Sequence, residues 1–237
     1  MTLQELLDSL FPAGHAITVS DQTITGTATT ARGPVTVLGT TGGAAISHDI
    51  ALNLADGILE TVAQYPGRAL IFLVDTSGQA LSRQQELLCL NGSLAHLAQC
   101  VDLARREGHP SISLVTEQAV SGGYLSFGLM TDRSYACADA QVRVMDLKAM
   151  ARVTKIAYER LAALAVDSAI IAPGAENYQR MGAIEAIWEP PLAVPLETAL
   201  AELAVARGMP DRRMSAGLAR GGRQLAAGVA AAVLAAN

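Results

Sequence analysis

Two short segments hold residues whose types and spacing suit the binding of a developing negative charge. Asp75-Thr76-Ser77-Gly78 follows a buried apolar run, and Ser121-Gly122-Gly123 lies between a predicted strand and a predicted helix. Paired glycines at the start of a helix let backbone N–H groups approach a substrate closely, and the helix dipole favours negative charge there. If the charge develops only during a reaction, these donors form an oxyanion hole, each typically worth about 3–4 kcal/mol. The alternative is a glycine pair that allows close packing of a helix on a strand.

Several polar side chains are expected near these segments. Asp75 is expected to hold its loop through hydrogen bonds to backbone amides. Asp146 is the best candidate for an acid that relays a proton. The hydroxyl of Ser121 is expected to cap a helix, because the G-x-S-x-G pattern of a nucleophile is absent. Lys148 and Lys155 are the only lysines and share one face of a predicted helix, where they could meet phosphates or remain solvated.

Other chemistries lack their usual patterns. The four histidines are not at metal-ligand spacing, and the three cysteines form no C-x-x-C pair, so no metal site is predicted. Gly39–Gly43 is rich in glycine but lacks the lysine of a P-loop. We expect the cysteines to be reduced, small, buried apolar side chains.

Composition narrows the class of protein further. The 237 residues are 51% hydrophobic, and the 16% that are charged fall below the usual share of about 25%. This excludes a disordered chain. A net charge of −5 and 4% aromatic residues argue against nucleic acid or an anionic membrane as partner. With no signal-peptide pattern and no apolar run long enough to span a bilayer, we expect a cytoplasmic protein. The low charge indicates either surfaces covered by partner subunits or an alanine-rich composition.

The elements that would position these residues alternate between strands and helices. This alternation, with buried strands, predicts a single α/β domain over residues 1–237 with a helical C-terminal extension from about residue 190. Strands are expected at 17–19, 23–29, 34–38, 69–74 and 111–115, two short ones within 135–144, and one ending near 187; helices are expected from Ser47 to Tyr65, from a Ser82/Gln85 capping box to Gly108, from Ser121, from Met145, from Asn177, and over 195–207 and 223–236.

The order of these motifs resembles a known superfamily. A buried strand with D-T-S-G (Asp75 to Gly78), a long helix, a strand, and then V-S-G-G-Y (Val120 to Tyr124) is similar to the carboxyltransferase branch of the crotonase superfamily, which shows D-T-P-G and later G-S-G-G-A. More narrowly, the chain resembles the gamma subunits of biotin-independent malonate decarboxylases. The resemblance covers Val35 to Trp188.

The resemblance implies a ββα spiral fold and an acyl thioester of coenzyme A or of an acyl-carrier subunit as substrate, with no covalently bound cofactor. A homologous beta subunit would complete the active site, and the pair would convert a malonyl thioester to an acetyl thioester and CO2 through an enolate. Gly122 and Gly123 would supply one amide donor, and a residue between Gly78 and Arg83 the other. The expected catalytic residues are Gly122, Gly123, Gly78, Arg83 and Asp146, and the expected substrate contacts are Asp75, Ser77, Ser121, Tyr124, Lys148 and Lys155.

Three other functions remain open on this resemblance. The chain could be a carboxyltransferase subunit that uses carboxybiotin, although Met145-Asp146-Leu147 stands where that branch usually has S-P-E. It could be a non-catalytic scaffold that completes the fold of its partner. A hydratase or isomerase acting alone is disfavoured, because hydratases of the superfamily use two carboxylates and Tyr124 to Met130 contains none.

Overall fold

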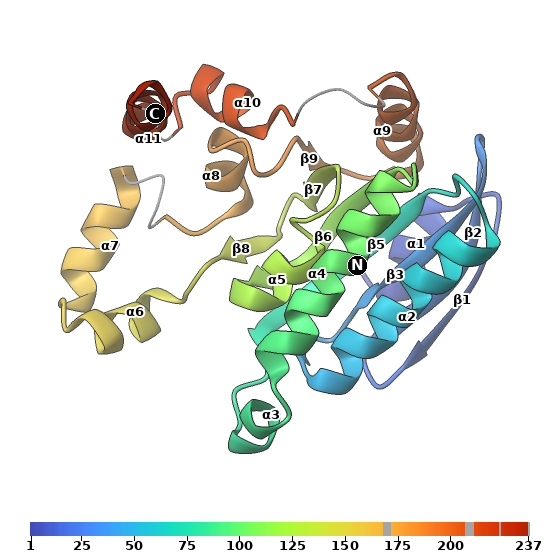
Figure 1. Cartoon of the computed structure of the whole chain (residues 1–237), viewed down its shortest axis with the longest axis horizontal. Coiled ribbons are helices and arrows are strands. Elements are labelled where there is room, and N and C mark those ends of the chain that lie inside the picture. The colour runs from blue at the N-terminus through green and yellow to red at the C-terminus, as the bar shows by residue number, and fades with distance from the viewer. Residues whose placement is uncertain (168–171, 207–210, 223, 237) are drawn as a thin grey trace.

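A single mixed sheet forms the centre of the molecule (Figure 1). The structure is a computed structural model that describes residues 1–167, 172–206, 211–222 and 224–236. Within these ranges the sheet has nine strands in the order β1-β2-β3-β5-β6-β7-β9, while β4 pairs with β5 and β8 pairs with β6. The strands are β1 (His15–Ser20), β2 (Thr23–Thr30), β3 (Gly33–Thr40), β4 (Ala44–Ile46), β5 (Leu70–Gln79), β6 (Ser111–Val120), β7 (Arg133–Cys137), β8 (Gln141–Arg143) and β9 (Ile187–Trp188).

Strands β5 and β6 continue beyond the main sheet, and this extension reshapes the predicted site. The register between them shifts between Val74 and Thr76, after which β5 pairs with β4 and β6 pairs with β8. The expectation that the chain leaves the sheet after Val74 is therefore wrong. Asp75 to Gly78 belong to a strand, because β4 supplies backbone partners that the sequence pattern does not reveal.

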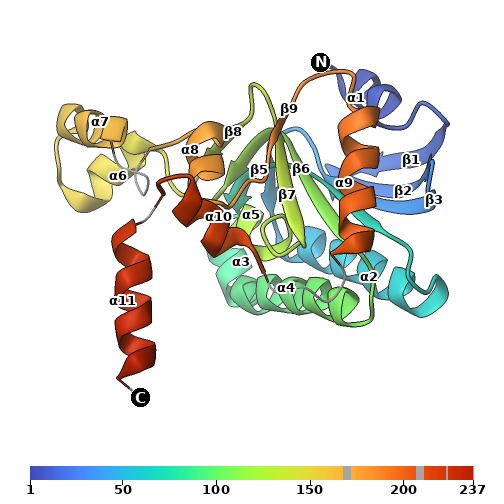
Figure 2. The ribbon, with the colours of Figure 1, turned by 90° about the horizontal axis from the view of Figure 1, so that it is seen from above.

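Helices cover both faces of the sheet. Helices α2 and α4 lie side by side on one face, while α1 and α9 lie together on the other (Figures 1 and 2). Two apolar cores result, one around Phe72 and Leu97 and the other around Ile71 and Leu196. The helices are α1 (Leu3–Leu10), α2 (His48–Gln64), α3 (Arg83–Leu87), α4 (Leu90–Arg106), α5 (Ser121–Phe127), α6 (Leu147–Thr154), α7 (Tyr158–Asp167), α8 (Ala175–Arg180), α9 (Ala193–Val205), α10 (Arg213–Ala219) and α11 (Gln224–Ala235).

The long helix expected from Ser82 is two helices. Cys89 has a left-handed backbone (φ 56°) and separates α3 from α4, and its side chain is exposed, not buried. Ser82 caps α3 as expected, accepting from the N–H of Gln85. The side chain of Gln85, however, accepts the N–H of His48 at 2.7 Å. The capping box is thus incomplete because Gln85 joins α3 to the start of α2.

The helices of the C-terminal third do not all pack on the sheet. Helix α9, the first of the expected C-terminal extension, packs Leu196, Ala199 and Leu200 on the sheet. Helices α6 and α7 form an arm beside the body, and α11 projects away from it (Figure 2). No residue of α11 whose burial is described is buried. Among the helices of the described ranges, none is long and apolar enough to cross a membrane.

Candidate active site

The two segments singled out by their chemistry meet where β5 ends and α5 begins. A Cβ atom placed on Gly123 would lie 2.9 Å from the backbone of Gly78 and 2.7 Å from the hydroxyl of Thr76. Gly123 is buried in this contact. A glycine is required at position 123 because the helix and the strand approach too closely for any side chain. This feature matches the packing alternative for one glycine of the pair.

Gly122 has a different environment. It is only partly buried, and its N–H donates to Oε1 of Gln79 at 3.2 Å. The N–H is therefore directed out of the helix, toward a side chain that can rotate away. The expectation that Ser121 caps the helix is wrong, because Val120 is the N-cap residue and no side chain caps α5. Ser121 has a left-handed backbone (φ 47°).

The second amide donor was expected between Gly78 and Arg83. The N–H of Gly78 already donates to the hydroxyl of Thr76 at 3.0 Å, and the N–H of Ala80 donates to the carbonyl of Ile46 at 2.9 Å. Both amides are occupied by the strand structure. Arg83 itself is exposed, at the first position of α3. Ser77 is also exposed.

Asp75 accepts a backbone N–H as expected, but the donor belongs to a distant turn and not to the segment that follows Asp75. Its side chain is 4% exposed, and Oδ2 accepts the N–H of Gly43 at 2.8 Å. Gly43 lies in the turn before β4, so Asp75 fixes that turn to β5. The other carboxylate oxygen, Oδ1, is buried without a hydrogen-bond partner.

Tyr124 lies inside the protein core and not at the surface. Its side chain is 2% exposed within the apolar core, and its hydroxyl lies 2.8 Å from Oγ of Ser134. Burial raises the pKa of the phenol well above its usual range. The tyrosine was expected to contact substrate, but the start of α5 turns its side chain inward.

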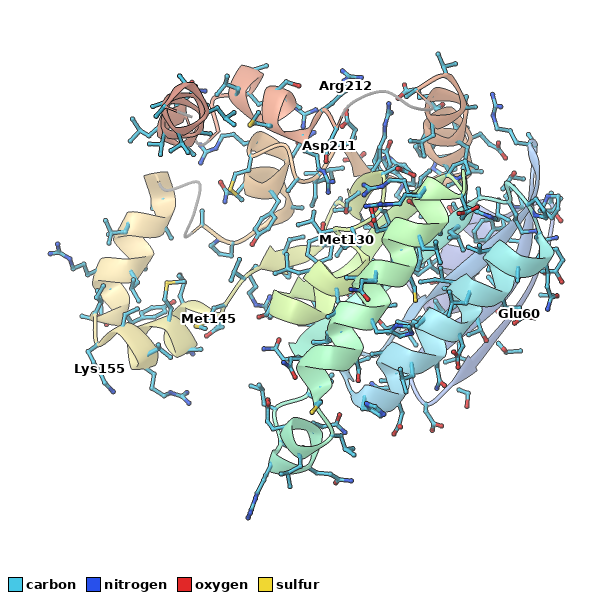
Figure 3. All side chains as sticks on the ribbon, in the orientation of Figure 1. Glu60, Met130, Met145, Lys155, Asp211 and Arg212 are labelled. Atoms are coloured by element: carbon cyan, nitrogen blue, oxygen red, sulfur yellow. The ribbon has the colours of Figure 1, made fainter. Side chains whose placement is uncertain are left out.

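Asp146 and the lysines lie at the ends of α6. Asp146 is the N-cap residue, accepting the N–H groups of Lys148 and Ala149 at 2.9 and 3.3 Å. Lys148 lies in the first turn, whereas Lys155 follows the last turn with a left-handed backbone (φ 62°). The two lysines therefore do not share one helix face. Figure 3 shows Lys155 on the arm, farther from the sheet than Met145.

Three polar residues near the glycine contact were not predicted. Gln79 contacts Gly122, while Gln118 and Arg143 are hydrogen-bonded to each other at 3.2 Å on the extensions of β6 and β8. The sequence signal that could have found them is a polar residue close to the end of an apolar strand. Across the described ranges, no three His, Cys, Asp or Glu side chains gather closely enough to hold a metal ion.

The mixed sheet with helices on both faces is of the crotonase-like α/β fold class that was expected. The fold is similar to that of a subunit in a Pseudomonas malonate decarboxylase hetero-tetramer in complex with coenzyme A (TM-score 0.79, 24% identity, 96% of this chain and 95% of that chain). It is also similar to the transcarboxylase 12S subunit (TM-score 0.72, 16% identity, 88% of this chain and 43% of that chain). The model of the malonate decarboxylase gamma subunit family matches residues 41–237, and the chain belongs to this family.

One curated relative is a malonyl-S-ACP:biotin-protein carboxyltransferase from Malonomonas rubra. It is 30% identical over 125 residues, which cover 52% of this chain. The match spans 43% of the length of that relative, less than half.

Proposed function

We propose that the chain is the gamma subunit of a malonate decarboxylase and acts with a homologous beta subunit on a malonyl thioester. The thioester is carried by an acyl-carrier subunit or by coenzyme A, and the products are CO2 and an acetyl thioester. Family membership over residues 41–237 supports this function. Acyl thioester chemistry and three free cysteines are consistent with the cytoplasm.

The reaction needs no protein nucleophile. As the bond between the carboxylate carbon and the α-carbon breaks, its electron pair moves onto the thioester carbonyl and forms an enolate oxygen. The protein must stabilise that oxygen and then allow a proton to reach the α-carbon. One observation carries the proposal. The N–H of Gly122 points out of the helix and donates to the side-chain amide oxygen of Gln79. When Gln79 rotates away, the same donor is available to the enolate oxygen.

The partner subunit completes the site in this proposal. Because the amides of Gly78 and Ala80 are engaged, the second donor comes from another residue between Gly78 and Arg83, or from the beta subunit. Exposed Ser77 and Arg83 are the contacts expected on this side. Asp146, which caps α6, remains the candidate proton relay. Lys148 and Lys155 are proposed to meet the phosphates of the carrier arm from the α6–α7 arm of the molecule.

The test uses the complex of this chain with its beta subunit and measures CO2 release from malonyl-coenzyme A. Replacing Gly122 with proline removes the N–H at the second position of α5, where an intrahelical partner is not required. Because proline also restricts the left-handed Ser121 before it, circular dichroism must show that the variant keeps the wild-type fold. We expect turnover to fall about 100- to 1000-fold in an intact complex. Asp49→Pro, at the exposed second position of α2, is the matched control and should retain activity. Unchanged turnover in Gly122→Pro would instead favour a scaffold subunit, and CO2 release by this chain alone would exclude a shared site.

Carboxyl transfer to biotin is the second candidate function. It is favoured by the similarity to the Malonomonas rubra carboxyltransferase. In that case a biotinylated carrier protein would be required for loss of the carboxyl group. CO2 release from malonyl-coenzyme A in the absence of any biotin protein distinguishes decarboxylation from transfer.

A further inference from the structure

Arg143 lies beside the start of α5, although Arg143 and Ser121 are 22 residues apart in sequence. In the parallel pairing of β6 with β8, Arg143 is directly opposite Val120. Val120 immediately precedes Ser121 and Gly122, and neighbouring strands lie about 4.8 Å apart. Arg143 therefore lies at the same edge of the sheet as the proposed oxyanion donor.

The guanidinium of Arg143 is incompletely satisfied. Its Nη2 donates to Oε1 of Gln118 at 3.2 Å, while its Nε is buried and has no hydrogen-bond partner. No carboxylate in the described ranges forms an ion pair with it; the arginines that do form ion pairs are Arg105, Arg106, Arg133, Arg213 and Arg220. A buried donor without an acceptor is unfavourable, and such a group in a folded protein commonly marks a bound ligand or water. An arginine presents its N–H groups as a planar fork that matches a carboxylate.

A chain of contacts holds this arginine in place. Gln118 accepts from Arg143, and its amide nitrogen lies only 2.6 Å from the position that a Cβ atom on Gly43 would occupy. Gly43 adopts a left-handed conformation (φ 63°) and is anchored by Asp75. The buried carboxylate thus supports the turn against which Gln118 packs, and Gln118 orients the guanidinium. These contacts explain why Asp75 is buried without being aimed at the glycine pair.

We propose that Arg143 binds the free carboxylate of the malonyl group and so makes the site specific for a malonyl over an acetyl thioester. This inference rests on the proposed function. The carboxylate carries its full charge in the bound substrate and loses that charge as CO2 leaves, so the arginine stabilises the ground state more than the transition state. Arg143 is therefore a specificity-determining residue whose loss weakens substrate binding without slowing the chemical step. The acetyl product lacks the charge and is released.

The test compares Arg143→Gln with wild type in the complex with the beta subunit. With malonyl-coenzyme A as the probe, we expect the KM to rise about 10- to 100-fold while kcat stays the same or increases. Inhibition by acetyl-coenzyme A should not change, because that ligand has no free carboxylate. Arg143→Lys should recover part of the loss, since it restores the charge without the fork. Arg32→Gln, an exposed arginine at the β2–β3 turn at the opposite end of the strands, is the matched control.

Three results would overturn the inference: a KM for Arg143→Gln within twofold of wild type, a fall in kcat with an unchanged KM, or an equal weakening of malonyl- and acetyl-coenzyme A binding. Calorimetry with malonate separates this inference from the proposed function. Suppose that the wild-type complex binds malonate, that Arg143→Gln abolishes this binding, and that no CO2 is released from malonyl-coenzyme A. The carboxylate site is then supported and the decarboxylase function is refuted. If wild type binds no malonate and releases no CO2, both fall.

Discussion

Alanine substitutions at the two adjacent glycines should have opposite effects on stability. A methyl group on Gly123 would meet the backbone of Gly78 at 2.9 Å and the hydroxyl of Thr76 at 2.7 Å. These atoms cannot move freely, because the Thr76 hydroxyl donates to the carbonyl of Ala44 at 2.7 Å and β5 is paired on both sides. A methyl group on Gly122 would meet the end of the Gln79 side chain at 3.1 Å and, in an ordinary van der Waals contact, Leu94 at 3.9 Å. The Gln79 side chain is flexible and can rotate.

The size of the difference follows from two opposing terms. Replacing glycine by alanine in a helix stabilises the folded state by up to about 1 kcal/mol. Overpacking a rigid contact costs about 1–3 kcal/mol, and the backbone atoms facing Gly123 place it at the upper end. We therefore expect Gly123→Ala to lower the free energy of unfolding by about 2 kcal/mol, and Gly122→Ala to leave it unchanged or raise it slightly. For a chain of this size the first change lowers the Tm by about 4–8 °C.

The assay is urea unfolding followed by circular dichroism, with the Tm measured on the same samples. The two variants have the same composition and the same helix, so each is the control for the other. Equal stability of the variants, or a more stable Gly123→Ala, would refute the conclusion that residue 123 is a glycine for packing. The result also decides how Gly123 can be used in catalysis experiments. A bulkier substitution there tests the fold before it tests the reaction.

Two further predictions concern buried groups. Asp75→Ala should lower the free energy of unfolding, measured with urea, by about 1.5–3 kcal/mol, because the N–H of Gly43 loses a charged acceptor. Asp75→Asn keeps an acceptor oxygen and should lower it less. Equal losses in the two variants would contradict the assigned hydrogen bond. Burial, with Glu117 and Asp139 adding to it, raises the pKa of the Cys137 thiol to about 11, so its alkylation rate should increase up to that pH while exposed Cys89 is modified first at pH 8. Because the folded state retains the proton of Cys137, this contribution to stability is present below the unfolded pKa of about 8.5 and is lost as the pH rises through about 11. Rapid modification of Cys137 at pH 8 in mass spectrometry would show that this burial is absent.

Local patterns were sufficient for several elements that depend on local sequence, but helix α1 was not predicted although Thr2 and Glu5 form a local capping box at its start. The β-branched residues before residue 40 predicted β1 to β3, and Ser47 caps α2 as expected, accepting the N–H of Ile50. The continuous apolar run before Asp75 was correctly assigned to a buried strand. Each of these features is determined by neighbouring residues, through propensity, capping or the burial of both faces.

Features that depend on distant residues were missed. The extension of β5 through Gly78 requires β4, and the extension of β6 through Val120 requires β8, so neither is visible in the segment itself. The break at Cys89 arises where Gln85 bonds to His48 instead of closing its own cap. The helix α10 lies in a segment with little apolar periodicity and packs against α8. Arg143 was missed because only the pairing of β6 with β8 brings it opposite Val120, just before the glycines.

The packing interpretation of Gly123 is compatible with the proposed donor role of Gly122. Gly123 lets α5 approach β5 so closely that no Cβ atom fits between them, which fixes the position of the first turn. Once that turn is fixed, the N–H of Gly122 must leave the helix at the end of β5, where it reaches the oxygen of Gln79. A looser contact at residue 123 would leave this donor without a defined direction, and a preorganised donor is what stabilises a developing oxyanion. The strand extensions serve the same end, since they bring Arg143 to the same edge through Val120. We therefore expect a side chain at residue 123, which would push α5 away from β5, to reduce CO2 release, even though this residue offers no side chain to the substrate.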